Sequence, residues 1–249
     1  MGGRIDCYLD IISFYSYLTY LDLIKNRAVL DSHGVQVEFH PVFLGGINAG
    51  SGNKPPWTLP AKAHYGQYDF KRSVARFPGL VVQPPKDLMA VALTVVPLRA
   101  LLFIKRNHSR QTFETALHYL MYRIWSPPDN MDLSKPENVI KALSEVPHDF
   151  KGHLQKKSPP NSPLLFTADE VKTIMQSTAS QEIKDLLKNT TQDALDKGAF
   201  GAPWLWVTNS KGRAEPFFGS DRFHFIYKFL DLPVQELALL PVAGDRSKL

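Results

Sequence analysis

Residues 5–17 decide the architecture of this chain, and they read Ile5-Asp6-Cys7-Tyr8-Leu9-Asp10-Ile11-Ile12-Ser13-Phe14-Tyr15-Ser16-Tyr17. The apolar stretch 5–9 predicts a short strand, and the apolar period that begins at residue 14 predicts a helix over 14–32. Residues 35–39 alternate apolar and polar side chains, which predicts a second strand. Strand, helix and strand within about 35 residues form a βαβ unit with parallel strands. An α/β core therefore begins near the N-terminus.

The far end of the sequence adds a second set of strands. Apolar runs over 204–207 and 215–218, separated by turn residues, predict a β-hairpin. The triplet Gly219-Ser220-Asp221 then precedes an apolar helical stripe over 223–230, which predicts an N-cap and a last helix. A βαβ unit followed by ββα is the order of a thioredoxin-type α/β fold.

Residues 60–197 lack convincing strands, and we expect them to form an inserted all-helical domain. Residues 1–59 and 198–249 would then make one discontinuous thioredoxin-like domain. The apolar stretch Leu88–Ile104 covers more than one helical face, so we expect a buried helix there and a homodimer built on the inserted helices. The predicted helices cover residues 61–76, 86–106, 110–125, 135–145, 168–176 and 180–196.

Composition excludes several classes of protein. The net charge of +5 is small for 249 residues and the basic pairs are scattered, which argues against a nucleic-acid partner. The apolar stretches are too interrupted for a membrane span, and Asp6 and Asp10 break any signal peptide. The eight histidines form no His-x-x-x-His pair and Cys7 is the one cysteine, so we expect no metal site and a buried, inert thiol. Nucleotide-binding and serine-hydrolase motifs are absent.

The turn between the first strand and the first helix is the first candidate site. In thioredoxin-type oxidoreductases a Cys-x-x-Cys pair occupies this turn, because the helix N-terminus stabilises a thiolate. Here Ser13 and Ser16 stand in both positions. Ser13 either donates a hydrogen bond to a bound thiolate or simply caps the helix, and the segment alone leaves both readings open.

Two further loops are candidates. At Ala202-Pro203 a cis proline would turn the main chain of Ala202 toward an extended peptide, and an ordinary edge-strand proline is the alternative. At the start of the last helix, Ser220 and Asp221 suit the carboxylate and ammonium of an α-amino acid, although capping explains Ser220 equally well.

Several segments between residues 5 and 232 occur in a recognisable order. They are Ser13-Phe14-Tyr15-Ser16, Gly45-Gly46-Ile47, Ser51-Gly52-Asn53-Lys54-Pro55-Pro56, Pro60-Ala61-Lys62, Met121-Tyr122-Arg123-Ile124-Trp125-Ser126, Gly198-Ala199-Phe200-Gly201-Ala202-Pro203 and Gly219-Ser220-Asp221-Arg222. Together these segments resemble the kappa-class glutathione transferases. This resemblance implies a fold similar to bacterial disulfide oxidoreductases and hydroxychromene-carboxylate isomerases, with a helical insertion, and a dimer.

The resemblance also implies a site for glutathione as co-substrate. Ser13 would be the catalytic residue that holds the glutathione sulfur, and Ala202 would pair with the cysteinyl main chain. The implied binding set comprises Ser13, Phe14, Tyr15, Asn53, Lys62, Ala202, Pro203, Ser220 and Asp221. Within that set Ser220 and Asp221 would hold the γ-glutamyl end, and Asn53 and Lys62 would reach the glycyl side. Phe14 replaces a proline common in the family, and Ala202 replaces a larger leucine.

We therefore expect a glutathione transferase that conjugates small hydrophobic electrophiles and also reduces organic hydroperoxides. A glutathione-dependent cis/trans isomerase of the hydroxychromene type, or a specialised biosynthetic step, is the enzymatic alternative. A non-catalytic module that binds glutathione or a partner is the other. Trp57, Trp204 and Trp206 are either core residues or walls of the electrophile pocket.

The last three residues, Ser247-Lys248-Leu249, match the address read by the peroxisomal import receptor. We expect a peroxisomal protein, with the mitochondrion and the cytoplasm as alternatives.

Overall fold

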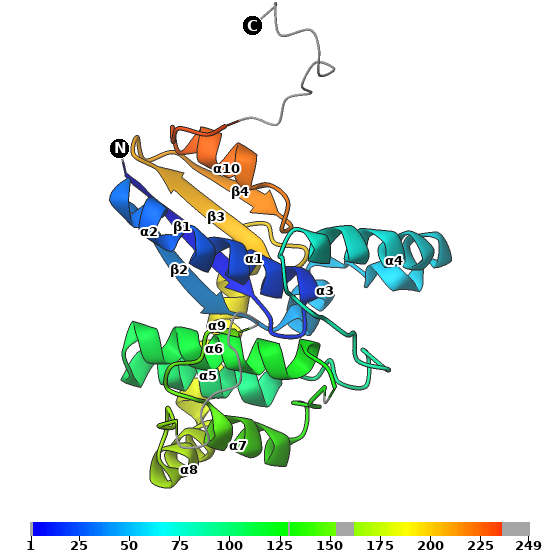
Figure 1. Ribbon diagram of the computed structural model, residues 1–249, viewed down its shortest axis with the longest axis vertical. Coiled ribbons are helices and arrows are strands. Elements are labelled where there is room, and N and C mark those ends of the chain that lie inside the picture. Colours follow the sequence, from blue (N-terminus) through cyan, green and yellow to red (C-terminus); the bar gives the residue numbers. More distant parts are fainter. Residues whose placement is uncertain (1, 129, 153–161, 236–249) are drawn as a thin grey trace, which may run out of the picture.

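The computed structural model describes residues 2–128, 130–152 and 162–235. Its centre is a four-stranded sheet with strand order β2-β1-β3-β4 (Figure 1). Strand β1 (Gly3–Leu9) pairs in parallel with β2 (Val35–Pro41), and on its other side it pairs antiparallel with β3 (Trp204–Asn209). Strand β4 (Ala214–Phe218) closes the hairpin with β3. The predicted βαβ and ββα halves are thus confirmed, and they meet at β1 and β3.

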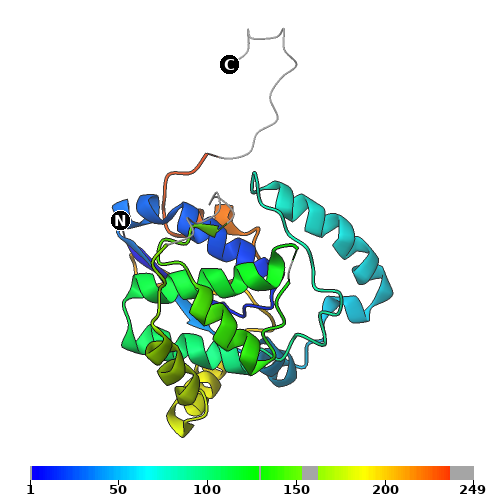
Figure 2. The same cartoon turned by 60° about the horizontal axis from the view of Figure 1, so that its bottom comes forward.

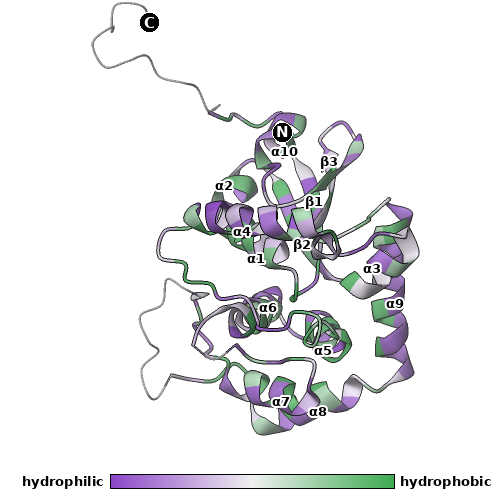
Figure 3. Ribbon diagram, turned by 90° about the vertical axis from the view of Figure 1, so that its right-hand side faces the viewer, coloured by the Kyte–Doolittle hydropathy of each residue, from purple (hydrophilic) through white to green (hydrophobic). Residues whose placement is uncertain are grey.

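The register of β1 sets the two faces of the sheet. Cys7 lies between Phe39 and Leu205, and all three side chains are buried. This face is covered by α1 (Phe14–Lys25), α2 (Arg27–Ser32) and α10 (Phe223–Phe229) (Figure 3). On the opposite face, buried Tyr8 and Trp204 pack against α3 (Leu44–Ser51) and α9 (Gln181–Asp196). Helices on both faces bury the two central strands, β1 and β3.

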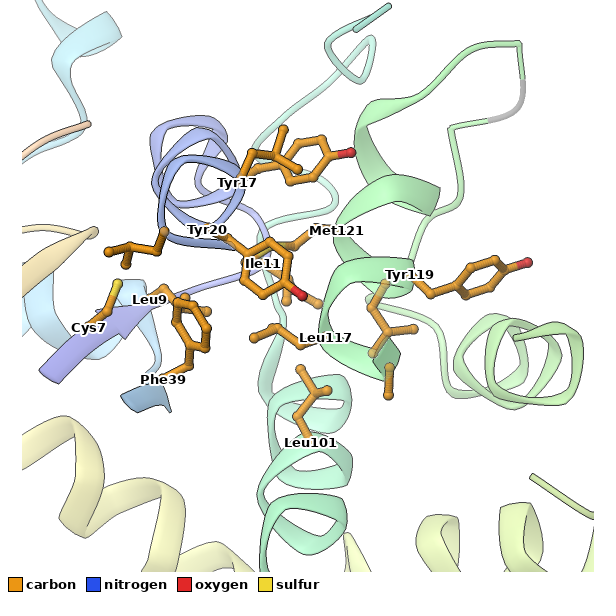
Figure 4. Close-up of a cluster of buried hydrophobic side chains, with 14 of the residues drawn as sticks. Cys7, Leu9, Ile11, Tyr17, Tyr20, Phe39, Leu101, Leu117, Tyr119 and Met121 are labelled. Atoms are coloured by element: carbon orange, nitrogen blue, oxygen red, sulfur yellow. The ribbon is translucent and has the colours of Figure 1, made fainter. Parts of the chain in front are cut away.

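Four helices form a body below the sheet in Figure 1, namely α5 (Val95–Asn107), α6 (Arg110–Trp125), α7 (Pro136–Glu145) and α8 (Ala168–Ser177). Helix α5 packs against the other three and against α9. Figure 4 shows that this body shares one core with the sheet, because Leu117 and Met121 of α6 lie beside Tyr17 and Tyr20 of α1.

Helix α4 (Pro60–Ala75) differs from the others because none of its side chains is fully buried. It projects from the side of the molecule next to α1, preceded by the short 3-10 helix η1 (Pro56–Thr58) (Figures 1 and 2). Exposed apolar side chains gather on this segment, namely Trp57, Leu59, Tyr65 and Tyr68. The predicted insertion at 60–197 therefore contains a packed body and a helix that stands beside it.

The structure corrects several element boundaries. The helix expected over 14–32 is broken at Asn26, whose side chain donates to the carbonyl of Asp22 and ends α1. The helix expected over 86–106 begins only at Val95, because residues 86–94 form bends, turns and irregular chain. Thr94 is its N-cap, and the Thr94 hydroxyl donates to the Asp10 carboxylate. The N-cap of the last helix is Arg222 rather than a residue of the 219–221 triplet. Helix α3 was not predicted.

The corrected α5 also removes the surface on which the homodimer prediction was based. Leu98, Leu101 and Ile104 are buried against helices of the same chain, whereas Met89 and Leu93 lie in the exposed turns before it. The oligomeric state stays a prediction.

Three other observations bear on the expected chemistry. Cys7 is fully buried, and burial raises the pKa of its thiol, which confirms an inert cysteine. In the described part of the chain no three acidic, histidine or cysteine side chains gather as metal ligands. No helix there is long and apolar enough to cross a bilayer.

Candidate functional site

The site is built on the turn that joins β1 to α1. Directly after β1, the carbonyl of Asp10 accepts the N–H of Ser13 at 3.0 Å, and the Asp10 carboxylate accepts the N–H of Ile12 at 3.2 Å. This tight turn places Ser13 at the N-cap of α1 in an extended conformation. A helix N-terminus therefore opens at the residue that the sequence singled out.

Ser13 performs the capping role and also contacts the Ala202 loop, while its role toward a thiolate stays a prediction. Its Oγ accepts the N–H of Ser16 at 3.2 Å, which is an N-cap bond. The same hydroxyl donates to the carbonyl oxygen of Ala202 at 2.8 Å. The peptide bond between Ala202 and Pro203 is cis, as predicted, and the hydrogen bond from Ser13 places the main chain of Ala202 beside the Ser13 side chain.

Backbone donors surround the Ser13 hydroxyl. Within the described residues, the N–H groups of Phe14 and Tyr15 have no acceptor, as expected in the first turn of a helix. The N–H of Ala202 has none either. A helix N-terminus with free N–H groups and a positive dipole end favours an anion such as a thiolate. An extended main chain can pair with both groups of Ala202.

The side chains of Phe14 and Tyr15 turn toward α4. Phe14 is 7% exposed, and its ring lies 4.3 Å from Phe70 and 5.4 Å from Trp125 between centroids. The Tyr15 hydroxyl donates to Asp69 at 2.6 Å, and burial together with this bond raises its pKa. Their contribution to an anion site is therefore through the main chain, while the side chains fix α4 to α1.

Asn53 reaches the same loop from the end of α3. Its side-chain amide donates to the carbonyl of Phe200 at 2.6 Å, two residues before Ala202. Lys62 lies in the first turns of α4, and helical periodicity places it on the same side as Asp69 and Phe70, which face α1. Lys62 is exposed. Asn53 thus lies beside the Ala202 loop, whereas the position of Lys62 is known only as a place on the α1-facing side of α4.

Ser220 and Asp221 border the site from the other side. Ser220 is 3% exposed, and its carbonyl accepts a hydrogen bond from Arg76 at 2.8 Å, while Arg76 also pairs with Asp22 of α1. Asp221 is exposed and pairs with Arg222 at 2.7 Å. Within the described residues the N–H groups of Ser220 and Asp221 have no acceptor. A carboxylate could accept from these two groups, whereas an ammonium must compete with Arg222 for Asp221.

The three tryptophans separate clearly. Trp204 is 5% exposed and lies in the core that includes Tyr8 and Ile47, and Trp206 is half-buried against the same cluster. Trp57 is exposed on η1. Of the three, Trp57 alone is exposed.

Sequence reasoning did not assign Asp10 to the site. Its side chain is fully buried, and burial raises its pKa to about 6, against the effect of hydrogen bonds from Leu44, Ile12 and Thr94. The signal was present in the sequence, because an aspartate directly after a strand and before a capping serine is typical of a turn closed by its own side chain.

Comparisons with known proteins show what the chain is similar to. The family model described as DSBA-like thioredoxin domain matches residues 4–142. A Caenorhabditis elegans protein named glutathione S-transferase kappa 1 is 29% identical over 250 residues, which cover 99% of this chain and 98% of that protein. The Homo sapiens protein of the same name is 27% identical over 230 residues, covering 91% and 90%.

Solved structures share the fold. A 2-hydroxychromene-2-carboxylate isomerase superposes with a TM-score of 0.64 at 16% identity, covering 92% of this chain and 94% of the isomerase. A probable DsbA oxidoreductase from Streptomyces coelicolor superposes with a TM-score of 0.60 at 15% identity, covering 98% and 97%. At these identities the similarity concerns the fold alone.

Proposed function

The chain belongs to the DSBA-like thioredoxin domain family, and we propose that it is a glutathione transferase of the kappa class. The observation that carries the proposal is the pair formed by the Ser13 hydroxyl and the Ala202 carbonyl, 2.8 Å apart, at the N-terminus of α1. Ser13 and Ser16 leave the site without a thiol of its own, so the reacting sulfur comes from a ligand. The similarity to two kappa-class proteins over nearly the whole chain supports glutathione as that ligand.

Binding proceeds through the free main-chain groups. The cysteinyl unit of glutathione pairs with the N–H and C=O of Ala202, and its sulfur lies at the N-terminus of α1. When the cysteinyl N–H approaches the Ala202 carbonyl, the Ser13 hydroxyl can rotate and donate to the sulfur instead. A hydrogen bond to a thiolate is stronger than one to a neutral carbonyl, so the exchange favours the ionised thiol.

The site needs to lower the pKa of the glutathione thiol only modestly. A free thiol has a pKa of about 8.5, and each unit of depression requires about 1.4 kcal/mol of preferential stabilisation of the anion. Ser13 and the N–H groups of Phe14 and Tyr15 can supply one to two such units, roughly, through a charge-assisted hydrogen bond and the helix dipole. A substantial fraction of bound glutathione is then thiolate at neutral pH.

The thiolate has two expected substrates. With an electrophilic carbon it forms a carbon–sulfur bond and the leaving group departs with the bonding electrons. With an organic hydroperoxide it takes the terminal oxygen, the O–O bond breaks and an alcohol leaves. A second glutathione then converts the glutathione sulfenic acid to the disulfide and water.

Calorimetry with glutathione, followed by turnover of a chloronitrobenzene and of cumene hydroperoxide, tests the proposal. We expect binding and thiolate-dependent turnover of at least one of the two substrates. Absence of glutathione binding would overturn the proposal. Binding without turnover of either substrate, or of a 2-hydroxychromene-2-carboxylate, would favour the non-catalytic alternative, and turnover of the chromene alone would favour the isomerase.

We also propose that the protein is imported into peroxisomes when Leu249 is its C-terminal residue in the cell. The support is the tripeptide Ser247-Lys248-Leu249, which lies outside the described residues. A fluorescent protein fused to the N-terminus should give punctate fluorescence that becomes diffuse when Leu249 is deleted. Puncta that survive the deletion would show that another signal acts.

A further inference from the structure

Asp10 is the buried charged group closest in sequence to Ser13. Its carboxylate accepts the N–H of Leu44 at 2.8 Å, the N–H of Ile12 at 3.2 Å and the hydroxyl of Thr94 at 2.9 Å from both oxygens. The side chains of Asp10 and Thr94 are both fully buried. Such a group is costly to bury unless every oxygen is bonded, and here each oxygen has one backbone donor while the single Thr94 hydroxyl proton is shared between them.

Three helices begin at this carboxylate. Leu44 is the first residue of α3, Thr94 is the N-cap of α5, and the turn from Asp10 leads into α1 at Phe14. The positive dipole ends of these helices therefore converge on one anion, which no side-chain cation contacts among the described residues. Asp10 thus ties together parts of the chain about 84 residues apart.

The bonds of Asp10 bear directly on Ser13. The carboxylate fixes Ile12, and the Asp10 carbonyl fixes the N–H of Ser13 at 3.0 Å. The orientation of the Ser13 hydroxyl and of the free N–H groups of Phe14 and Tyr15 follows from this turn. The Thr94 hydroxyl, which belongs to the helical body, donates the remaining hydrogen bond to the Asp10 carboxylate.

We propose that Asp10 is a positioning residue for the thiolate site, and that the Thr94 hydroxyl couples the inserted helical body to the Ser13 turn through it. This inference deepens the proposed glutathione transferase function and its glutathione readout rests on it. The structure supports it through the convergence of the Leu44, Ile12 and Thr94 donors on one buried side chain. Burial raises the pKa of Asp10 to about 6, while the hydrogen bonds from Leu44, Ile12 and Thr94 favour its ionised form.

A matched set of threonine variants tests the coupling. Thr94→Val removes the hydroxyl with little change in shape, and Thr94→Ser keeps it. Thr178→Val removes another buried hydroxyl, which donates to the Met175 carbonyl at 2.7 Å in α8 and has no bond to Asp10. Circular dichroism and thermal unfolding establish that each variant is folded.

The readout is the pKa of a thiol at the turn, measured in two independent ways. The first is the thiolate absorbance of bound glutathione as a function of pH. The second is the pH dependence of iodoacetamide alkylation of the thiol introduced by Ser13→Cys, which requires no glutathione. Cys7 is buried and does not compete.

We expect Thr94→Val to raise both thiol pKa values by about one unit, and to lower kcat at pH 6.5 by roughly tenfold. Thr94→Ser and Thr178→Val should leave both values unchanged. Asp10→Asn should act in the same direction as Thr94→Val, and if that variant does not fold the threonine set still decides.

An unchanged pKa in folded Thr94→Val, or an equal rise in Thr178→Val, would overturn the proposal. A fall in the pKa would also overturn it, because it would show that Asp10 acts as a repelling charge rather than by positioning. If wild-type protein does not bind glutathione, the transferase proposal fails while alkylation of the introduced thiol still tests Asp10.

Discussion

The Ser13 hydroxyl accepts the N–H of Ser16, which caps α1, and donates to the carbonyl of Ala202. The cap and the proposed hydrogen bond to a thiolate therefore depend on the same hydroxyl. The two contributions can be separated because the chain contains other capping serines. Ser109 and Ser180 cap α6 and α9 with the same kind of bond, at 3.1 and 3.3 Å.

Ser13→Ala should leave the fold intact, weaken glutathione binding modestly and raise the pKa of the bound thiol by about one unit. Loss of the cap should cost about 1 kcal/mol of stability, as in Ser109→Ala and Ser180→Ala. The measurement is thiolate absorbance across pH, with denaturant unfolding of all three variants. If the absorbance and the rates at pH 6.5 stay unchanged in Ser13→Ala, Ser13 is only a cap.

Lys62 is expected to bind the glycyl carboxylate, and the substrate itself offers the control. Lys62→Ala should raise KM for glutathione several-fold with little effect on kcat, because it removes uniform binding. γ-Glutamylcysteine, which lacks the glycyl unit, should be insensitive to the variant. Lys71→Ala on the opposite side of α4 is the matched protein control. An equal loss with both substrates would show that Lys62 acts on α4 rather than on the ligand.

Helix α4 differs from the other elements because packing contributes little to it. Its connections to the rest of the chain include the Tyr15–Asp69 hydrogen bond, the packing of Phe70 and Val74 against the main core, and the bonds of its C-cap Arg76. Segments with few buried apolar contacts open more often than the core. Helix α4 is therefore held beside the Ser13 site mainly by bonds to α1 and to the Ser220 carbonyl.

In the monomeric form of the chain, we expect the amide protons of α4 to exchange at least about tenfold faster than those of α6, whose inner face is buried. Saturating glutathione should slow exchange in α4 if Lys62 binds the ligand, with α8 as the internal control. Hydrogen exchange with mass spectrometry gives both rates. Equal protection of α4 and α6 without ligand would contradict this view of α4.

The elements also show which features the sequence could predict. The helix over 110–125 follows from its local apolar period and its Ser109 cap, and the structure confirms it. The start of α5 cannot be predicted from the local pattern, because the hydroxyl of Thr94, its N-cap, donates to the carboxylate of Asp10, 84 residues away in the chain. At the site, the Ser13 and Ala202 loops were predicted from the order of elements along the chain. The hydrogen bond from Asn53 to the Phe200 carbonyl depends on the packing of α3, which no sequence motif predicts.

At the scale of the whole molecule, buried carboxyl groups make stability depend on pH. Burial raises the pKa of Asp10 to about 6, and burial outweighs Arg76 to raise that of Asp22 to about 6. Both values lie above the unfolded pKa of about 3.9, so the stability they contribute is fully present below pH 4, roughly, and is lost as the pH rises through 6.

The contribution of Asp6 to stability has the opposite pH dependence. Burial alone would raise its pKa, but bonds from His40 and Arg4 lower it to about 2, so its contribution is lost only below pH 4, roughly.

The free energy of unfolding, measured in urea between pH 4.5 and 7.5, should therefore lose a contribution from Asp22 of up to about 3 kcal/mol as the pH rises. In Asp22→Asn this part of the pH dependence should disappear, so the variant should improve relative to wild type as the pH rises. Asp31→Asn on exposed α2 is the control and should follow wild type. Parallel curves for wild type and Asp22→Asn would contradict the prediction.

The exposed apolar surface of the whole molecule determines where a homodimer would form. The stretch 88–104 is covered by helices of the same chain over most of α5, so it leaves little area for a partner. The η1–α4 segment instead exposes Trp57 at 42%, Tyr65 at 58% and Tyr68 at 52%, on a helix that buries none of its side chains. Clustered exposed aromatic side chains on a projecting element are typical of an interface, because Tyr and Trp bury large area at low entropic cost.

We therefore predict a homodimer that uses α4 of the inserted segment. Light scattering at micromolar concentration should give twice the mass of the chain for wild type, and the double substitution Tyr65→Glu, Tyr68→Glu should give the single-chain mass with an unchanged circular dichroism spectrum. Phe225→Glu, at a residue 50% exposed on α10, is the control and should remain dimeric. A monomeric wild type would contradict the dimer itself, whereas a dimer that survives the α4 substitutions would place the interface on another surface. Helix α4 carries Lys62, a proposed glutathione ligand, and contacts Tyr15 through Asp69, so loss of the dimer should weaken glutathione binding as well. A dimer-breaking variant that binds glutathione as tightly as wild type would show that α4 keeps its position without a partner.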